Sequence, residues 1–113
     1  KPTKFSEEIM ASPMRIRATE SGGVVDVKVL MRHLMETGLR KSSDGKPIPA
    51  WFITILDAKV QDKVVFTAEF GPAVSKDPFL NFKLKGTAKK GDTLVVSWVD
   101  NKGETNSSTV EVK

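Results

Sequence analysis

Apolar and polar residues alternate with a period of two along most of the chain from residue 13 onward. This alternation is typical of β-strands that have one buried face and one solvent face. It predicts strands over residues 14–18, 25–31, 64–70, 80–85, 94–99 and 110–112. A further strand is predicted at residues 51–56, WFITIL, because β-branched and aromatic residues form a nearly continuous run there, typical of a strand covered on both faces.

Short turn sequences separate these runs, and the sequence Asp100-Asn101-Lys102-Gly103 gives the strongest hairpin signal, since Asn and Gly both tolerate positive φ. Seven short strands at regular spacing, without a convincing helix, predict an all-β fold, an immunoglobulin-like antiparallel β-sandwich. We expect this domain to occupy residues 13–113, after an N-terminal extension of residues 1–12. Trp51 is the expected buried tryptophan of its core.

One segment breaks the alternation. From Leu34 to Pro49 the chain reads LMETGLRKSSDGKPIP, a polar and turn-rich stretch between two predicted strands. Loops of this length inside a small domain are often functional. Pro47 and Pro49 also favour extended backbone at the residues before them.

Composition narrows the function classes. The chain has 113 residues, of which 39% are hydrophobic and 28% charged, which suits one globular domain. No apolar run approaches the roughly 20 residues of a membrane span, and no apolar secretion signal follows Lys1. The net charge of +4 comes from scattered lysines. This pattern favours a slightly basic surface that meets an acidic partner, and not nucleic-acid binding.

Catalytic chemistry has little support. The absence of Cys excludes a thiol nucleophile, a disulfide and a thiolate metal site. The only histidine, His33, shares its parity with Val29 and Met31, so we expect a hydrogen-bonded structural residue at the end of the inward face. We therefore predict no enzyme, no catalytic residue, no cofactor and no metal.

A copper(I) site is the sharpest alternative. His33, Met31 and Met35 would offer one imidazole and two thioethers, which are soft ligands suited to Cu(I). Such a site needs a further donor, for which Met10 and Met14 are candidates. Methionine fills gaps in a core more often than it binds metal. A small copper-binding or protein-interaction module thus stays open as an alternative.

Apolar residues on the outward parity of three strands predict a covered face. The cover would be a protein partner, or the chain's own loops and N-terminal segment. A single β-bulge would invert the assignment of a strand's two faces. The predicted partner-facing residues are Leu30, Leu34, Phe52, Leu56, Val95 and Val99.

The segment that begins at His33 resembles the signature of the SoxZ family. The sequence reads His33-Leu34-Met35-Glu36-Thr37-Gly38 with Arg40, followed by Gly45-Lys46-Pro47-Ile48-Pro49. The family typically reads H-P-M-E-T-G-x-R and then G-K-x-I-P, so Leu34 stands where the family has proline. The resemblance continues to Asp100-Asn101-Lys102-Gly103 and covers residues 14–113.

The resemblance implies a non-catalytic subunit of the thiosulfate-oxidising Sox system, without a cofactor. Such a subunit forms a heterodimer with SoxY, whose cysteine on a flexible arm carries sulfur between a cytochrome, a hydrolase and a dehydrogenase. It implies a periplasmic location, with export in company with the partner. The exposed apolar face leaves a symmetric homodimer possible when the partner is absent. Because this chain has no Cys, the thiol that carries the sulfur would belong to the partner. The loop residues expected to position the partner's cysteine-bearing segment or to guide docking are His33, Met35, Glu36, Thr37, Gly38, Arg40, Gly45, Lys46, Pro47 and Pro49.

Overall fold

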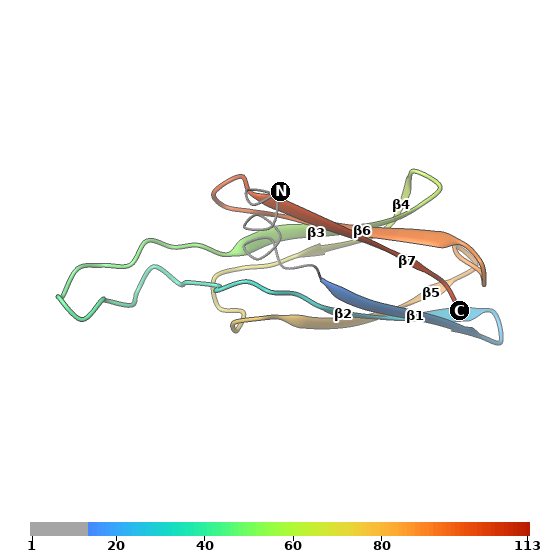
Figure 1. The fold of residues 1–113 in the computed structure, drawn as a ribbon, viewed down its shortest axis with the longest axis horizontal. Coiled ribbons are helices and arrows are strands. Elements are labelled where there is room, and N and C mark those ends of the chain that lie inside the picture. The colour runs from blue at the N-terminus through green and yellow to red at the C-terminus, as the bar shows by residue number, and fades with distance from the viewer. Residues whose placement is uncertain (1–13) are drawn as a thin grey trace, which may run out of the picture.

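The structure, a computed structural model, describes residues 14–113, which form seven strands and no helix (Figure 1). The strands are β1 (Arg15–Ser21), β2 (Val24–Leu30), β3 (Ile53–Val60), β4 (Lys63–Glu69), β5 (Phe79–Lys85), β6 (Thr93–Asp100) and β7 (Thr105–Glu111). They form a three-stranded sheet in the order β1-β2-β5 and a four-stranded sheet in the order β4-β3-β6-β7, all antiparallel. The predicted seven-strand sandwich is confirmed, whereas the predicted N-terminal extension lies outside the described residues.

The predicted turns connect the strands. Gly103 has a φ of 83° and donates its N–H to the carbonyl of Asp100 over 3.0 Å, which closes the β6–β7 hairpin. The β3–β4 turn is made without glycine, since Gln61 and Asp62 have φ values of 54° and 64°. A two-residue hairpin turn of type I′ needs positive φ at both central residues, and Asp is one of the side chains that tolerate it best.

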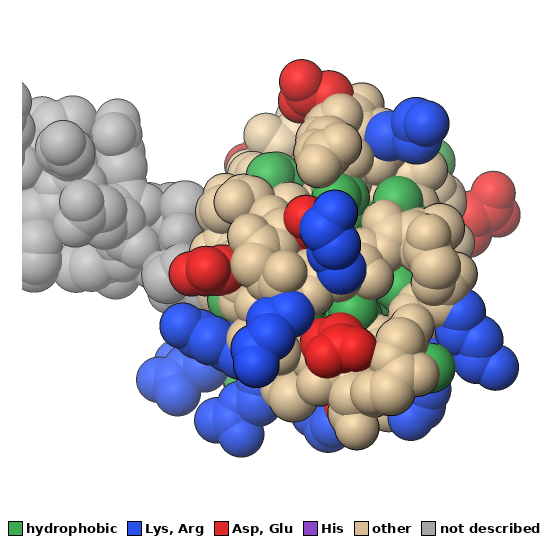
Figure 2. Space-filling view, turned by 90° about the vertical axis from the view of Figure 1, so that its right-hand side faces the viewer, with side chains coloured by type: hydrophobic (Ala, Val, Ile, Leu, Met, Phe, Trp, Pro, Cys, Tyr) green, Lys and Arg blue, Asp and Glu red, His purple; other side chains and the backbone are tan. Residues whose placement is uncertain are grey.

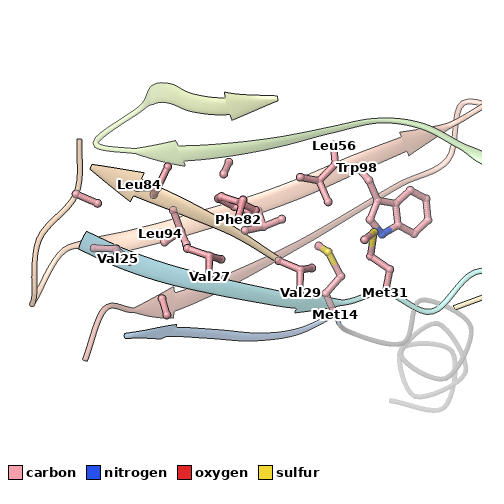
Figure 3. Packing of buried hydrophobic residues seen from close by; sticks show 14 of the residues in the cluster. Met14, Val25, Val27, Val29, Met31, Leu56, Phe82, Leu84, Leu94 and Trp98 are labelled. Carbon is pink, nitrogen blue, oxygen red and sulfur yellow. The ribbon is translucent and has the colours of Figure 1, made fainter. Parts of the chain in front are cut away.

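Alternate residues of both sheets fill one core between the layers (Figure 3). The rings of Phe66 on β4 and Phe82 on β5 stack across the layers with centroids 3.9 Å apart. The prediction for the core tryptophan was wrong. Trp98 on β6 is the buried one, whereas Trp51 is half-buried and precedes β3.

The central strand β3 carries a bulge that inverts its predicted faces. Ile53 pairs with Asp100 and Ile55 pairs with Val99, so Thr54 is an extra residue opposite β6. The side chains of Ile53 and Leu56 are therefore fully buried, whereas Ile55 is 39% exposed. The placement of Leu56 on the outward face was wrong for this reason.

One edge of the sandwich is closed by the end of the chain. The N–H of Lys113 donates to the carbonyl of Ala18 over 3.0 Å, and the carbonyl of Lys113 accepts from the N–H of Glu20 over 2.8 Å. These bonds tie the segment after β7 to β1 in the other sheet. Within residues 14–113 the structure contains no helix that is long and apolar enough to cross a membrane.

Candidate functional site

An extended arm projects from one end of the sandwich, beyond both layers (Figure 1). It comprises residues 36–51, between β2 and β3, and two chain segments run antiparallel along it. Glu36 and Trp51 exchange both of their backbone hydrogen bonds at its base, at 2.6 and 3.0 Å. Lys41 and Pro47 form a second bridge near the tip. The arm is thus an irregular hairpin, built from the loop that breaks the pattern of alternation.

Local sequence explains why the arm turns and narrows as it does. At the tip, Gly45 has a φ of 84° and donates its N–H to the carbonyl of Ser42 over 2.9 Å. Near the base, Gly38 has a φ of 88°, and a Cβ placed there would lie 3.1 Å from the Cβ of Ala50 on the opposite segment. Glycine at position 38 therefore permits both the backbone conformation and the close approach of the two segments.

A buried polar cluster anchors the arm to the sandwich. The carboxylate of Asp100, at the end of β6, accepts hydrogen bonds from His33 Nε2 at 3.1 Å and from Trp51 Nε1 at 2.7 Å on its Oδ2 atom. Its Oδ1 atom accepts the backbone N–H groups of Lys102 and Glu104 at 3.0 and 2.9 Å. Burial alone raises the pKa of Asp100, but these four hydrogen bonds outweigh it, so the pKa lies below its ordinary value of 3.8.

The imidazole of His33 is fixed by hydrogen bonds at both ring nitrogens and by contacts with two tryptophan rings. Its Nδ1 atom accepts the backbone N–H of Met35 over 3.0 Å, so the proton is assigned to Nε2, which donates to Asp100. The rings of Trp51 and Trp98 contact it edge to face, with centroids 5.4 and 5.2 Å away. The backbone of His33 also exchanges two hydrogen bonds with Asp77, at 3.0 and 2.9 Å. This is the buried, hydrogen-bonded position that the strand pattern predicts.

The arrangement does not favour the copper alternative. Both ring nitrogens of His33 have partners within the protein, and the Sδ atom of Met35 accepts the N–H of Ile53 at 3.3 Å. Met31 is fully buried in the core, where Figure 3 shows its sulfur beside the Trp98 ring. Met10 lies outside the described residues. Among residues 14–113 no group of three or more His, Asp and Glu side chains is arranged to hold a metal ion.

The family-signature residues beyond this cluster line the exposed arm. Arg40 binds Glu36 through two hydrogen bonds of 3.1 and 2.6 Å, and these lower the pKa of the Glu36 carboxyl. Thr37 accepts the N–H of Leu39 over 3.0 Å, and Leu39 is 87% exposed. Lys46 donates its backbone N–H to Asp44 over 3.2 Å at the tip. Pro47 and Pro49 have no N–H, which keeps the ladder between the two segments sparse.

The structure does not bring the six predicted partner-facing residues onto one surface. Leu30 lies on the outer face of the three-stranded sheet, whereas Val95 and Val99 lie on the outer face of the four-stranded sheet. Leu34 and Phe52 flank the base of the arm. Leu56 is in the core, and Ile55 takes its place beside Val99.

Sequence reasoning missed several functional candidates. The sequence pattern marks Asp100 only as a turn residue, and its partnership with His33 spans 67 positions of the chain, which no local pattern reveals. Ile55 was missed because the bulge at Thr54 reverses parity. Phe79 could have been found, since it begins the alternation of β5 on the outward parity.

Comparisons with known proteins give a family and a fold. A family model described as "Sulphur oxidation protein SoxZ" matches residues 14–111. None of the curated protein sequences matches the chain.

Superoxide reductases are among the solved structures that resemble the chain. A variant of the superoxide reductase (neelaredoxin) from Ignicoccus hospitalis has a TM-score of 0.64 at 14% identity, with 97% of this chain and 86% of that chain covered. The superoxide reductase (neelaredoxin) from Archaeoglobus fulgidus in the reduced form has a TM-score of 0.51 at 21% identity, with 89% and 90% covered. At these identities the likeness shows a shared sandwich fold and nothing about activity.

Proposed function

Since the chain belongs to the SoxZ family of sulfur oxidation proteins, we propose that it is the non-catalytic subunit of a sulfur-carrier heterodimer, paired with a SoxY-type subunit whose cysteine carries the sulfur. The observation that carries this proposal is the arm. The family-signature residues from Glu36 to Pro49 form a projecting hairpin, whose base is fixed by the hydrogen bonds of Asp100 with His33 and Trp51. Its role is to hold the partner and to position the partner's cysteine-bearing segment for the enzymes that load and unload it.

The chain's own groups do not favour catalysis. The one histidine has both ring nitrogens in internal hydrogen bonds, and the Asp100 carboxylate is fully buried and accepts four of them. A general base needs access to a substrate proton, which neither group has here. The superoxide reductases that share the fold therefore supply no argument for an enzymatic role. We also propose that the heterodimer works in the periplasm, as the family resemblance implies.

The outer face of the four-stranded sheet is the best-suited partner surface. Ile55, Val99 and Thr105 form one cross-strand row, and Val95 lies further along the same face of β6. Along β3 and β6 the outward positions carry only Asp57 and Lys59 as charged residues, whereas Glu69 on β4 and Glu111 on β7 lie toward the edges of the face. Cores of stable interfaces are depleted of charge, so the middle of this face, along β3 and β6, suits burial against the partner. It also adjoins the arm, because β3 begins where the arm ends.

A matched pair of substitutions tests this surface. Ile55 and Leu30 are both 39% exposed, but they lie on the outer faces of different sheets. We expect Ile55→Glu to weaken binding of the SoxY-type subunit by about 100-fold, because it buries an unpaired carboxylate in the interface. Leu30→Glu should change the affinity by less than about threefold. Isothermal titration of the partner into each variant measures both affinities.

Thermal unfolding of both variants serves as the control for folding, since each changes an exposed side chain. If Leu30→Glu abolished heterodimer formation and Ile55→Glu left it intact, the partner surface would be on the wrong sheet. If the wild-type chain bound no SoxY-type subunit at all, the proposed function itself would be rejected.

A further inference from the structure

The outer face of the three-stranded sheet carries a dense set of cations. Arg17 on β1 is the cross-strand partner of Lys28 on β2, and Lys83 on β5 is the partner of Asp26. Arg15 and Lys85 extend the same face toward its two ends. When the molecule is viewed from the end opposite the arm, Lys and Arg side chains gather over its lower side, where the three-stranded sheet lies (Figure 2).

This face keeps a net positive charge. Asp26 is the one acidic residue among the outward positions of β1, β2 and β5. Hydrogen bonds from Lys28 and Asn81, together with the charge of Lys83, lower its pKa to about 2, so it stays ionised at neutral pH. Within residues 14–113 no carboxylate forms an ion pair with Arg15, Arg17 or Lys85.

An apolar hollow lies among these cations, at the end of the face nearest the arm. It is shallow, encloses about 220 Å³ and is lined by Arg15, Ile16, Arg17, Lys28, Leu30 and Phe79. Leu30 and Phe79 are direct cross-strand partners, and the Phe79 ring is 61% exposed. Two exposed apolar side chains ringed by cations fit an apolar side chain surrounded by carboxylates.

We infer that this face, which we name the cationic face (Arg15, Arg17, Lys28, Leu30, Phe79, Lys83 and Lys85), is the docking surface for an acidic protein that acts on the carrier. This inference rests on the proposed function, because the occupant is one of the enzymes that meet the assembled heterodimer. The partner's acidic patch binds the cations, and an apolar side chain at its centre enters the hollow. The carrier subunit occupies the other sheet, so both proteins are bound at once.

The apolar hollow favours a folded protein over a polyanion as the occupant. A nucleic acid or a lipid surface would gain from the cations but would leave Leu30 and Phe79 without an apolar partner. Long-range attraction between opposite charges speeds encounter and weakens steeply as salt screens it. Docking at this face should therefore be fast and sensitive to salt, as suits a carrier that visits several enzymes in turn.

The experiment uses the assembled heterodimer and measures its binding to the Sox cytochrome, hydrolase and dehydrogenase separately by surface plasmon resonance. The double variant Arg17→Glu/Lys28→Glu reverses adjacent charges at the centre of the face. We expect it to weaken binding to at least one of these proteins by about 10-fold or more at ~50 mM salt and to flatten the salt dependence. Phe79→Ser should raise the dissociation rate about fivefold without altering that dependence.

The matched control is Lys63→Glu/Lys90→Glu, which makes the same change in net charge at the β3–β4 and β5–β6 turns. It should leave affinity within about twofold of wild type, because neither residue belongs to the three strands that form the cationic face. Equal effects of the two double variants would overturn the inference, and so would wild-type binding by Arg17→Glu/Lys28→Glu.

Binding measurements also distinguish a protein from other occupants of the cationic face. Tight binding of the wild-type heterodimer to single-stranded DNA or to phosphatidylserine vesicles, lost in Arg17→Glu/Lys28→Glu while enzyme binding persists, would overturn the assignment to a protein. Failure of the heterodimer to form would reject the proposed function separately. The same binding measurements, made with the wild-type and variant chains without the partner, would then decide the inference by the same criteria.

Discussion

Replacing Asp100 by Asn is expected to lower the free energy of unfolding by about 3–5 kcal/mol, the cost of breaking a buried network that holds a charge. The Asp100 carboxylate accepts hydrogen bonds from His33, Trp51 and two backbone N–H groups, two on each oxygen. An amide of the same shape has one oxygen and one NH₂ group. In either orientation two donors would face the NH₂ group, so two buried donors would lose their acceptor. Denaturant unfolding followed by tryptophan fluorescence measures the loss.

The same substitution should change the response of stability to acid. The pKa of Asp100 is lower in the folded protein than its ordinary value of 3.8, so the ionised carboxylate stabilises the fold above that value. This contribution is lost as the pH falls from about 4 through the folded pKa. The difference in unfolding free energy between wild type and Asp100→Asn should therefore shrink as the pH falls below about 4. Asp26, whose pKa is also lowered, is present in both proteins and cancels.

A control variant separates this effect from a general loss of negative charge. Asp62 lies exposed in the β3–β4 turn with a φ of 64°, which Asn adopts readily. Asp62→Asn should change stability by less than about 0.5 kcal/mol. If Asp100→Asn were as mild as this control, the buried cluster would not be the anchor of the arm.

Truncating Leu56 should cost about 2–5 kcal/mol, whereas truncating its neighbour Ile55 should cost less than about 1 kcal/mol. Leu56 is fully buried between the sheets, so Leu56→Ala leaves a cavity in the core. The side chain of Ile55 points outward from the same strand and is 39% exposed. The pair is matched in chemistry and adjacent in sequence, so the comparison isolates burial.

Equilibrium unfolding in urea gives both values, and the slope against urea should stay unchanged if the two variants remain two-state. A larger cost for Ile55→Ala than for Leu56→Ala would contradict the bulge at Thr54. Such a result would instead fit the faces that simple alternation predicts for this strand, with Ile55 inward and Leu56 outward.

Alternation alone predicted most of the fold because strands with one buried face dominate this chain. In β2, Val25, Val27 and Val29 are inward as their parity requires. The same rule failed in β3, where one extra residue reverses the faces and the apolar run WFITIL hides the change. Periodicity cannot locate a bulge when residues of both parities are apolar.

The candidate site was predicted in part. The loop from His33 to Pro49 and the inward position of His33 followed from the sequence, because a break in alternation and a shared parity are local signals. The anchoring role of Asp100 did not follow, since its partners His33 and Trp51 are 67 and 49 positions away. The opposite characters of the two outer faces also required the sheet pairing, because scattered lysines gather only when β1, β2 and β5 align.

The two outer faces of this small sandwich suit two different kinds of binding partner. The low-charge face beside β3 and β6 suits a permanent partner, whereas the cationic face suits brief, salt-sensitive encounters. The arm projects from one end of the sandwich, beyond both sheets (Figure 1). A companion subunit of this design would contribute surfaces to the sulfur cycle and no reactive group.

In the proposed function, this chain presents the partner's cysteine to the enzymes of the system without taking part in the chemistry. The most direct test is the initial rate at which the Sox cytochrome loads thiosulfate sulfur onto the SoxY-type cysteine, followed by intact-protein mass spectrometry with and without this chain. We expect that adding the chain raises the rate about 10-fold or more and that sulfur appears only on the partner. An unchanged rate, or sulfur bound to this chain, would contradict it.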